Sequence, residues 1–215
     1  SVDVLDVSYT FVSYARVYSN IAHDNGHSGI SVLNSNSTRV YSNNIQRNGY
    51  AGISIANGGN NTVASNTIID NYGHGVVFQN EENSIINSAN SITANQGDGI
   101  QIINSPNAYI HNNNVNNNDG NGLSIESNLV QVNSGQFNLN GLNGIKITGD
   151  YNIVRGAAQI GRNTENGVYC VGLSNSIYET TNLSTNILSG AVIIGNNNAI
   201  NNSVIRNNGR DGIEL

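Results

Sequence analysis

The chain has 215 residues and a formal net charge of −6, and it contains 44 Asn, 24 Gly, one Lys and one Cys. Its eight Lys and Arg residues are dispersed, which argues against a nucleic-acid partner, and no apolar run approaches the roughly 20 residues of a membrane span. A single cysteine excludes an internal disulfide framework and a cysteine-based zinc site. No cofactor is expected.

A glycine followed by an apolar residue, any residue and a second apolar residue recurs every 22 to 24 residues. The nine glycines are Gly29, Gly52, Gly75, Gly99, Gly122, Gly144, Gly167, Gly190 and Gly212. Four residues before each of them stands an asparagine, namely Asn25, Asn48, Asn71, Asn95, Asn118, Asn140, Asn163, Asn186 and Asn208. Nine matches out of nine are not expected by chance even in this Asn-rich chain, so the period is an internal repeat.

Each repeat predicts three short strands in chain order. The first passes through an apolar column at Val40, Val63, Ile86, Ile110, Val132, Tyr178 and Ile200. The second passes through a column seven residues before the glycine, at Ala22, Ile45, Ile68, Ile92, Val115, Phe137, Ile160, Leu183 and Ile205. The third begins just after the glycine and alternates apolar with variable residues, which indicates one buried face. Cys170 lies in an inward column of this strand and is expected to be a small buried hydrophobe.

Three short strands joined by Asn- and Gly-rich turns are typical of a right-handed parallel β-helix. We therefore expect an all-β solenoid of about nine coils, forming one domain over residues 1–215. Stacked coils bury a continuous core, and the asparagines at a corner form a hydrogen-bonded ladder while tolerating left-handed backbone conformations. A second corner column reads Asn20, Asn43, Asn66, Asn90, Asn113, Gly135, Ala158, Thr181 and Ser203.

The leucine-rich repeat is the main alternative, because it has a similar period and an asparagine ladder of its own. Its pattern requires Leu-rich strands with the asparagine after them. This chain has only ten Leu, and its asparagine precedes the strand. The calcium-binding nonapeptide pattern is absent as well.

Residues 20–30, with the sequence NIAHDNGHSGI, resemble the repeats of alginate (mannuronan) C5-epimerases, and the whole chain resembles the pectin-lyase-like superfamily of β-helix proteins. The resemblance implies that catalytic groups project from the glycine strand, as in the epimerases, where they have a Tyr-Gly-Phe-Asp-Pro-His arrangement. The nearest match here is residues 72–79, where Val77 and Gln79 stand in place of the Asp and the His. The resemblance thus implies epimerase-like repeats without the catalytic pair.

The outward positions of the glycine strand predict one polar cluster on adjacent coils, formed by Gln101, Glu126, Lys146 and Tyr169. A lysine there would neutralise a uronate carboxylate while Tyr or Glu moved a proton, as epimerisation or β-elimination requires. The alternative is a solvated Glu126–Lys146 pair worth under about 1 kcal/mol. The four histidines fall in different columns, so no metal site is expected.

Two features favour a structural role. The constant spacing leaves no room for the long loops that usually build a substrate cleft. Neither end looks capped, since Asp6 and Val7 already fit the strand register one period before Gly29. An uncapped solenoid is expected to stack end to end, with the strand containing Val2, Val4 and Val7 as the donor to a second copy of the chain.

We therefore expect an extracellular or cell-surface β-helix that is part of a fibre or adhesin. The alternative is a carbohydrate-active or carbohydrate-binding module, related to alginate epimerases or lyases, that takes an acidic polysaccharide. The missing catalytic pair counts against turnover but not against binding. Asn36, Asn60, Asn182 and Asn201 lie in glycosylation sequons, which matter only in a source that glycosylates secreted proteins.

Overall fold

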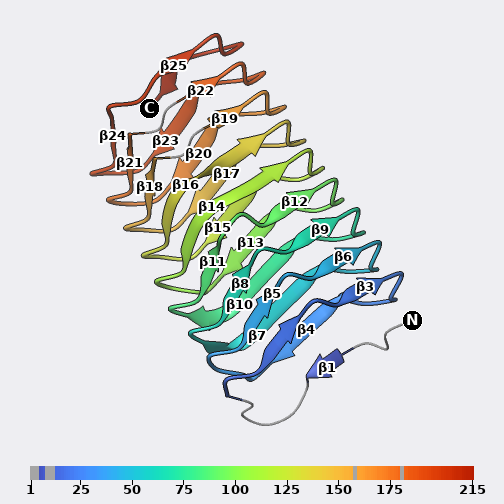
Figure 1. Cartoon of the computed structure of the whole chain (residues 1–215). Coiled ribbons are helices and arrows are strands. Elements are labelled where there is room, and N and C mark those ends of the chain that lie inside the picture. The colour runs from blue at the N-terminus through green and yellow to red at the C-terminus, as the bar shows by residue number, and fades with distance from the viewer. Residues whose placement is uncertain (1–4, 8–12, 157–158, 180–181) are drawn as a thin grey trace.

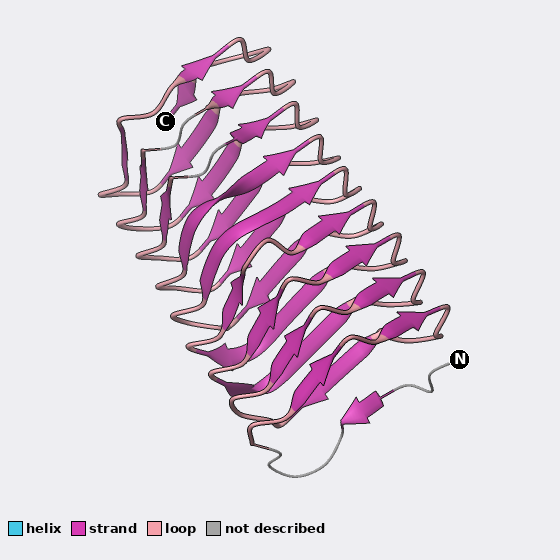
Figure 2. Cartoon of the chain, in the orientation of Figure 1, coloured by secondary structure: helices cyan, strands magenta, loops and turns pink. Residues whose placement is uncertain are grey.

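The computed structural model of the chain describes residues 5–7, 13–156, 159–179 and 182–215 (Figure 1). Every regular element in these ranges is a strand (Figure 2). The paired strands all run parallel and stack coil upon coil from β1 to β26. The described residues thus form a parallel β-solenoid, which confirms the fold class, and they include no helix able to cross a membrane.

Three faces of the solenoid carry strands. Sheet 1 has ten: β1 (Leu5–Val7), β4 (Ile30–Leu33), β7 (Ile53–Gly59), β10 (Val76–Glu82), β13 (Ile100–Ile103), β15 (Leu123–Glu126), β17 (Ile145–Thr148), β20 (Val168–Val171), β23 (Ala191–Ile194) and β26 (Ile213–Glu214). Sheet 2 contains β2 (Arg16–Tyr18), β5 (Arg39–Tyr41), β8 (Thr62–Ala64), β11 (Ile85–Asn87), β18 (Ile153–Arg155), β21 (Ser176–Tyr178) and β24 (Ala199–Asn201). Sheet 3 contains β3 (Ile21–His23), β6 (Asn44–Gln46), β9 (Thr67–Ile69), β12 (Ser91–Thr93), β19 (Gln159–Gly161), β22 (Leu183–Ser184) and β25 (Ile205–Arg206). Two long strands, β14 (Tyr109–Asn116) and β16 (Gln131–Asn138), run through sheets 2 and 3 without a break.

The predicted apolar columns face a common core along the solenoid. In sheet 3, Ala22 pairs with Ile45 and Ile45 with Ile68, and the same column continues to the pair Leu183 and Ile205, as the sequence predicts. Cys170 is fully buried beside Ile147 and Ile193, and burial raises the pKa of its thiol to about 11. The thiol is therefore a core side chain rather than a reactive group.

One position of the sheet 2 column differs from the prediction. Ile177 pairs with Val154 and Ile200 and is 1 % exposed, whereas Tyr178 is half-buried on the outer face. The assignment of Tyr178 to the inner column is wrong by one residue. Because strand side chains alternate, a slip of one residue moves the side chain to the opposite face.

The register of the first strand also differs. Leu5 pairs with Ile30 and Val7 with Val32, two residues away from the predicted alignment of Val7 with Ile30. A shift of two residues preserves the inward and outward alternation, so hydrophobicity alone does not detect it. The rest of the proposed donor strand, Val2 and Val4, lies outside the described residues.

The first asparagine ladder is continuous over all nine predicted positions. From Asn25 to Asn186, each Nδ2 donates to the Oδ1 of the asparagine one coil further on, at 2.9–3.2 Å. The same Oδ1 atoms also accept the backbone N–H of the preceding coil's ladder asparagine. Hydrogen bonding thus satisfies a row of amides of which most are fully buried.

Asparagines take left-handed backbone conformations at several corners, as at Asn34, Asn57 and Asn80, but at this corner the left-handed residue is not the ladder asparagine itself. Positive φ angles of 50–63° occur at the residue before each of them, namely Asp24, Arg47, Asp70, Ala94, Asn117, Leu139, Arg162, Thr185 and Asn207. The ladder asparagine is thus selected for its side-chain amide, and the residue before it takes the unfavourable backbone conformation.

The second ladder runs from Asn20 to Asn113, with amide-to-amide bonds of 2.8–3.1 Å. It ends at Gly135, which has no side chain to continue it, while Ala158 and Thr181 lie outside the described residues. A further ladder, unforeseen in the sequence, precedes the glycines of sheet 1. There the amides of Asn166, Asn143 and Asn121 donate in turn, and the last reaches Asp98 Oδ1.

Candidate functional site

The structure brings three of the four predicted site residues into one row. Gln101, Lys146 and Tyr169 occupy the same outward position of sheet 1, with Ser124 between the first two. Glu126 lies one row further along, opposite Ile103. Among the described residues, no direct ion pair joins Glu126 and Lys146.

A shallow cleft places a different carboxylate beside this row. Lys146 and Tyr169 line it together with Glu165, from the turn before sheet 1. Glu165 Oε2 accepts a hydrogen bond of 2.7 Å from Asn143 Nδ2, which fixes its carboxylate at the rim. The sequence search missed Glu165 because it considered only outward positions on the strand. Lys146, Tyr169 and Glu165 provide a cation and two groups that can carry a proton.

The segment that matches the epimerase motif lies around the start of β10. Val77 is 2 % exposed and Gln79 is exposed. Neither side chain carries a titratable group, so neither supplies an acid or a base at this face. Next to it, the Asp98 backbone N–H donates to His74 Nδ1 at 2.9 Å, which leaves the imidazole proton on Nε2. The 3.7 Å approach of Asp98 Oδ2 to the same Nδ1 is therefore not an ion pair in this tautomer. Nowhere in the described ranges do three or more His, Cys, Asp or Glu side chains gather as a metal site.

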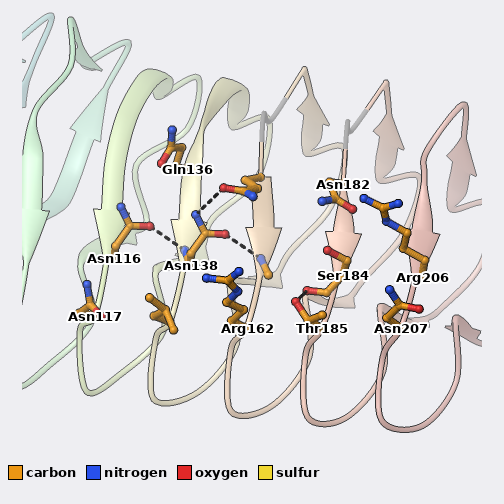
Figure 3. A pocket seen from close by; sticks show the side chains of 13 residues that line it. Asn116, Asn117, Gln136, Asn138, Arg162, Asn182, Ser184, Thr185, Arg206 and Asn207 are labelled. Atoms are coloured by element: carbon orange, nitrogen blue, oxygen red, sulfur yellow. Dashed lines mark hydrogen bonds between the residues drawn. The ribbon is translucent and has the colours of Figure 1, made fainter.

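A second candidate site is a polar groove of about 450 Å³ on the outer face of sheet 3 (Figure 3). It is lined by residues of β14, β16, β19, β22 and β25 and by residues adjacent to these strands: Asn116, Asn117, Gln136, Asn138, Leu139, Gln159, Gly161, Arg162, Asn182, Ser184, Thr185, Arg206 and Asn207. With coils about 4.8 Å apart, five successive coils extend the groove by roughly 19 Å along the solenoid axis. The groove is thus shaped for an elongated ligand.

The groove amides are oriented by hydrogen bonds. Asn116 Oδ1 accepts the backbone N–H of Asn138 at 2.9 Å, and Asn138 Oδ1 accepts that of Gly161 at 3.0 Å (Figure 3). Because the side-chain oxygens are occupied in this way, the two NH₂ groups are the parts left to face a ligand. The one hydrogen bond of the Asn138 NH₂ to another described residue is a long one, 3.4 Å, to Gln159 Oε1.

Two arginines lie at the groove, on coils two apart. Arg162 and Arg206 are both exposed, and Figure 3 shows Arg206 extending from β25 toward Asn182 and Ser184. No Asp or Glu is among the described residues that line the groove. In a chain of net charge −6, this is a local surface of hydrogen-bond donors and positive charge. It is suited to binding carboxylate groups.

Sequence reasoning missed the groove, because its residues follow the second predicted strand rather than the glycine strand. The available signal was the pair Arg162 and Arg206 close to ladder asparagines, with no acidic residue in the same columns on the adjacent coils. That signal is weak without coordinates, since it depends on which side chains face outward.

The family profile described as "Right handed beta helix region" matches residues 3–115, which is more than half of the chain. The chain therefore belongs to the right-handed β-helix family. A comparison with curated protein sequences finds no match.

Solved structures with this fold include proteins that act on alginate. The A-module of mannuronan C-5 epimerase AlgE6 from Azotobacter vinelandii is 18% identical with a TM-score of 0.61, and the match covers 92% of this chain and 58% of that one. An alginate lyase from Paenibacillus sp. is 13% identical with a TM-score of 0.60, covering 88% and 77%. The periplasmic alginate epimerase AlgG is 19% identical with a TM-score of 0.57, covering 95% and 46%. At these identities the likeness shows the fold alone, and the chain spans only about half the length of AlgG and somewhat more of the AlgE6 module.

Proposed function

We propose that the chain binds an acidic polysaccharide, a polyuronate, in the groove of sheet 3. The observation that carries the proposal is the donor character of the groove: two guanidinium groups, two amides (Asn116 and Asn138) whose oxygens are already bonded, and no carboxylate among the described lining residues. Coils about 4.8 Å apart match the length of one sugar unit in an extended chain, so successive coils can meet successive sugars. The similarity to alginate epimerases and a lyase supports this ligand class.

Binding in the groove is proposed without turnover there. The titratable side chains that line it are Arg162 and Arg206, and an arginine does not give up its proton in proteins. Proton abstraction from a uronate needs a group that can accept a proton near neutral pH. The groove therefore holds a chain in place and does not alter it.

Calorimetric titration of the protein with alginate and polygalacturonate fragments tests this proposal. Arg162→Gln and Arg206→Gln are each expected to weaken binding about tenfold, as the loss of a charged hydrogen bond does. Added salt should weaken binding to the native protein as well. Arg210→Gln removes the same charge outside the groove and should change little. Equal affinity for neutral dextran, or an equal loss in Arg210→Gln, would contradict the proposal.

A second candidate function belongs to the cleft of sheet 1, where Lys146, Tyr169 and Glu165 meet. There the lysine would neutralise a uronate carboxylate, and Tyr169 or Glu165 would move the proton on C5. Digests of alginate followed by NMR would detect unsaturated ends or a changed C5 configuration. Loss of such products in Tyr169→Phe, with retention in Arg162→Gln, would assign catalysis to the cleft. If the native protein forms no such products, catalysis at the cleft is contradicted and only the binding function is retained.

An acidic polysaccharide ligand agrees with the extracellular or cell-surface location expected from the sequence. End-to-end stacking into a fibre remains a separate prediction. Negative-stain electron microscopy over a range of concentrations tests it: unbranched filaments support stacking, and short dispersed rods at every concentration contradict it.

A further inference from the structure

A pair of arginines and a pair of tyrosines form a compact array on the outer face of sheet 2. Strands β2 and β5 carry the same sequence, Arg-Val-Tyr, and pair in register, so that Arg16 faces Arg39 and Tyr18 faces Tyr41. The valines between them are buried, which directs all four other side chains outward. We call Arg16, Tyr18, Arg39 and Tyr41 the Arg–Tyr platform.

The tyrosine rings of the platform are stacked. Their centroids are 5.0 Å apart with an interplanar angle of 8°, and Arg39 Cζ lies 6.0 Å from the centre of the Tyr41 ring. Tyr18 remains 52% exposed. The next coil places Ala64 in register with Tyr41, so no aromatic side chain continues the stack on that side. Aromatic surface next to guanidinium groups is thus accessible.

The two arginines face each other across neighbouring strands without a carboxylate to pair with among the described residues. Like charges directly opposite each other on neighbouring strands are destabilising. Arg47 shows the structural use of arginine in this chain: it donates to both oxygens of Asp24 at 2.8 and 3.0 Å and holds the pKa of that carboxyl at about 2. Arg16 and Arg39 have no such partner in the part of the chain that the structure describes, which points to an external anion.

We propose that the Arg–Tyr platform is a second binding subsite for acidic polysaccharide, distinct from the groove of sheet 3. A guanidinium group pairs with a uronate carboxylate, and the apolar face of the sugar ring rests against a tyrosine. Single-stranded nucleic acid has partly similar chemistry, but the net charge of −6 and the dispersed basic residues disfavour it.

The proposal rests on the proposed function and deepens it, because the two subsites can hold one ligand. Sheets 2 and 3 merge in β14 and β16, and the groove begins three coils beyond the platform, at a distance of roughly 14 Å along the axis. A polysaccharide long enough to reach both subsites binds the second in an intramolecular step and gains affinity over a short fragment.

Titrations with polyuronate fragments of increasing length test the platform. Arg39→Gln and Arg16→Gln should each weaken binding of long chains about tenfold, and should leave short fragments that fill the groove almost unaffected. Arg210→Gln is the charge-matched control. Thermal unfolding adds a second measurement. Arg16, unlike Arg39, has no ring contact among the described residues, so Arg16→Gln only relieves like-charge repulsion and should be at least as stable as the native protein while binding long chains less tightly.

The outcomes separate this inference from the proposed function. Long chains that bind no tighter than short ones, with Arg39→Gln equal to Arg210→Gln, overturn the platform even if the groove variants lose affinity. Loss of affinity in the platform variants alone supports the platform and overturns the groove. Tighter binding of single-stranded DNA than of polyuronate at the platform overturns the ligand class.

Discussion

The side chain of Asn71 hydrogen-bonds to the ladder asparagines of both neighbouring coils. Its Oδ1 accepts both the backbone N–H and the side-chain amide of Asn48, at 3.1 and 2.9 Å, and its own amide donates to Asn95. Asn71→Ala leaves these buried groups without partners, so we expect a loss of about 3 kcal/mol in unfolding free energy, measured by urea denaturation. The exposed Asn114 is the control, since Asn114→Ala should stay within about 0.5 kcal/mol. Similar losses in both variants would contradict a special role for the ladder.

Glu81 makes stability depend on pH. The residue is fully buried; Oε2 accepts bonds from Asn61 and Ser84, whereas Oε1 has no side-chain partner among the described residues. Desolvation raises the pKa of its carboxyl. The native state therefore keeps a proton on Glu81 that the unfolded state loses above about pH 4.3. Between that pH and the raised native pKa, the free energy of unfolding falls with rising pH by up to about 1.4 kcal/mol per pH unit.

Glu81→Gln tests this pH dependence because it keeps an acceptor for Asn61 and removes the titration. Urea denaturation from pH 4 to pH 8 should show the variant gaining stability over the native protein as pH rises. A constant difference across that range would show that Glu81 does not titrate on folding.

At the scale of the element, the repeated glycine has a steric cause. A Cβ on Gly29 would lie 2.6 Å from Ile45 Cγ2 and 2.7 Å from Asn48 Nδ2, both on the next coil. Gly29→Ala is therefore expected to cost about 3 kcal/mol in unfolding free energy through overpacking. Gly26→Ala, three residues earlier in the same coil, meets nothing within 4 Å and should be neutral or stabilising. Equal effects of the two substitutions would refute the steric explanation.

At the left-handed residue before each ladder asparagine, a substitution to glycine is expected to increase the free energy of unfolding. Ala94 is exposed and has a φ of 56°, a conformation that costs an L-amino acid roughly 1–2 kcal/mol and costs glycine almost nothing. Ala94→Gly should raise the free energy of unfolding by about 0.5 kcal/mol after the greater chain entropy of glycine is counted. Ala56→Gly, in strand β7, should lower it. Denaturation midpoints that move in the same direction would contradict the corner assignment.

Elements with a strict period were predictable, and those that depend on side-chain direction were not. The column from Ala22 to Ile205 follows from spacing alone, because every coil repeats the same apolar position. Ile177 was missed because an aromatic residue one position later resembles a core residue. The carboxylate at Glu165 and the groove arginines belong to turns and outer faces, where sequence periodicity does not specify which side chains meet.

At the scale of the whole molecule, each coil contacts only its neighbours, so stability should be graded along the axis. Ile100, Ile110 and Val115 on a central coil are fully buried, whereas Ile213 on the last coil is 44% exposed. Hydrogen exchange measured by mass spectrometry should be slowest in β10 to β17 and fastest in β24 to β26. Uniform protection along the chain would indicate one cooperative unit instead.

The ladders also have an evolutionary consequence. Because sheets and ladders share the same repeat, a duplication of residues 26–48 adds one complete coil and continues every sheet and ladder. Coils of 22 and of 24 residues keep the same ladder contact, so a difference of one residue is accommodated within its own coil. Genes for such a molecule can lengthen or shorten by unequal recombination in steps of about 23 codons, and each step changes the length of the rod without altering its cross-section.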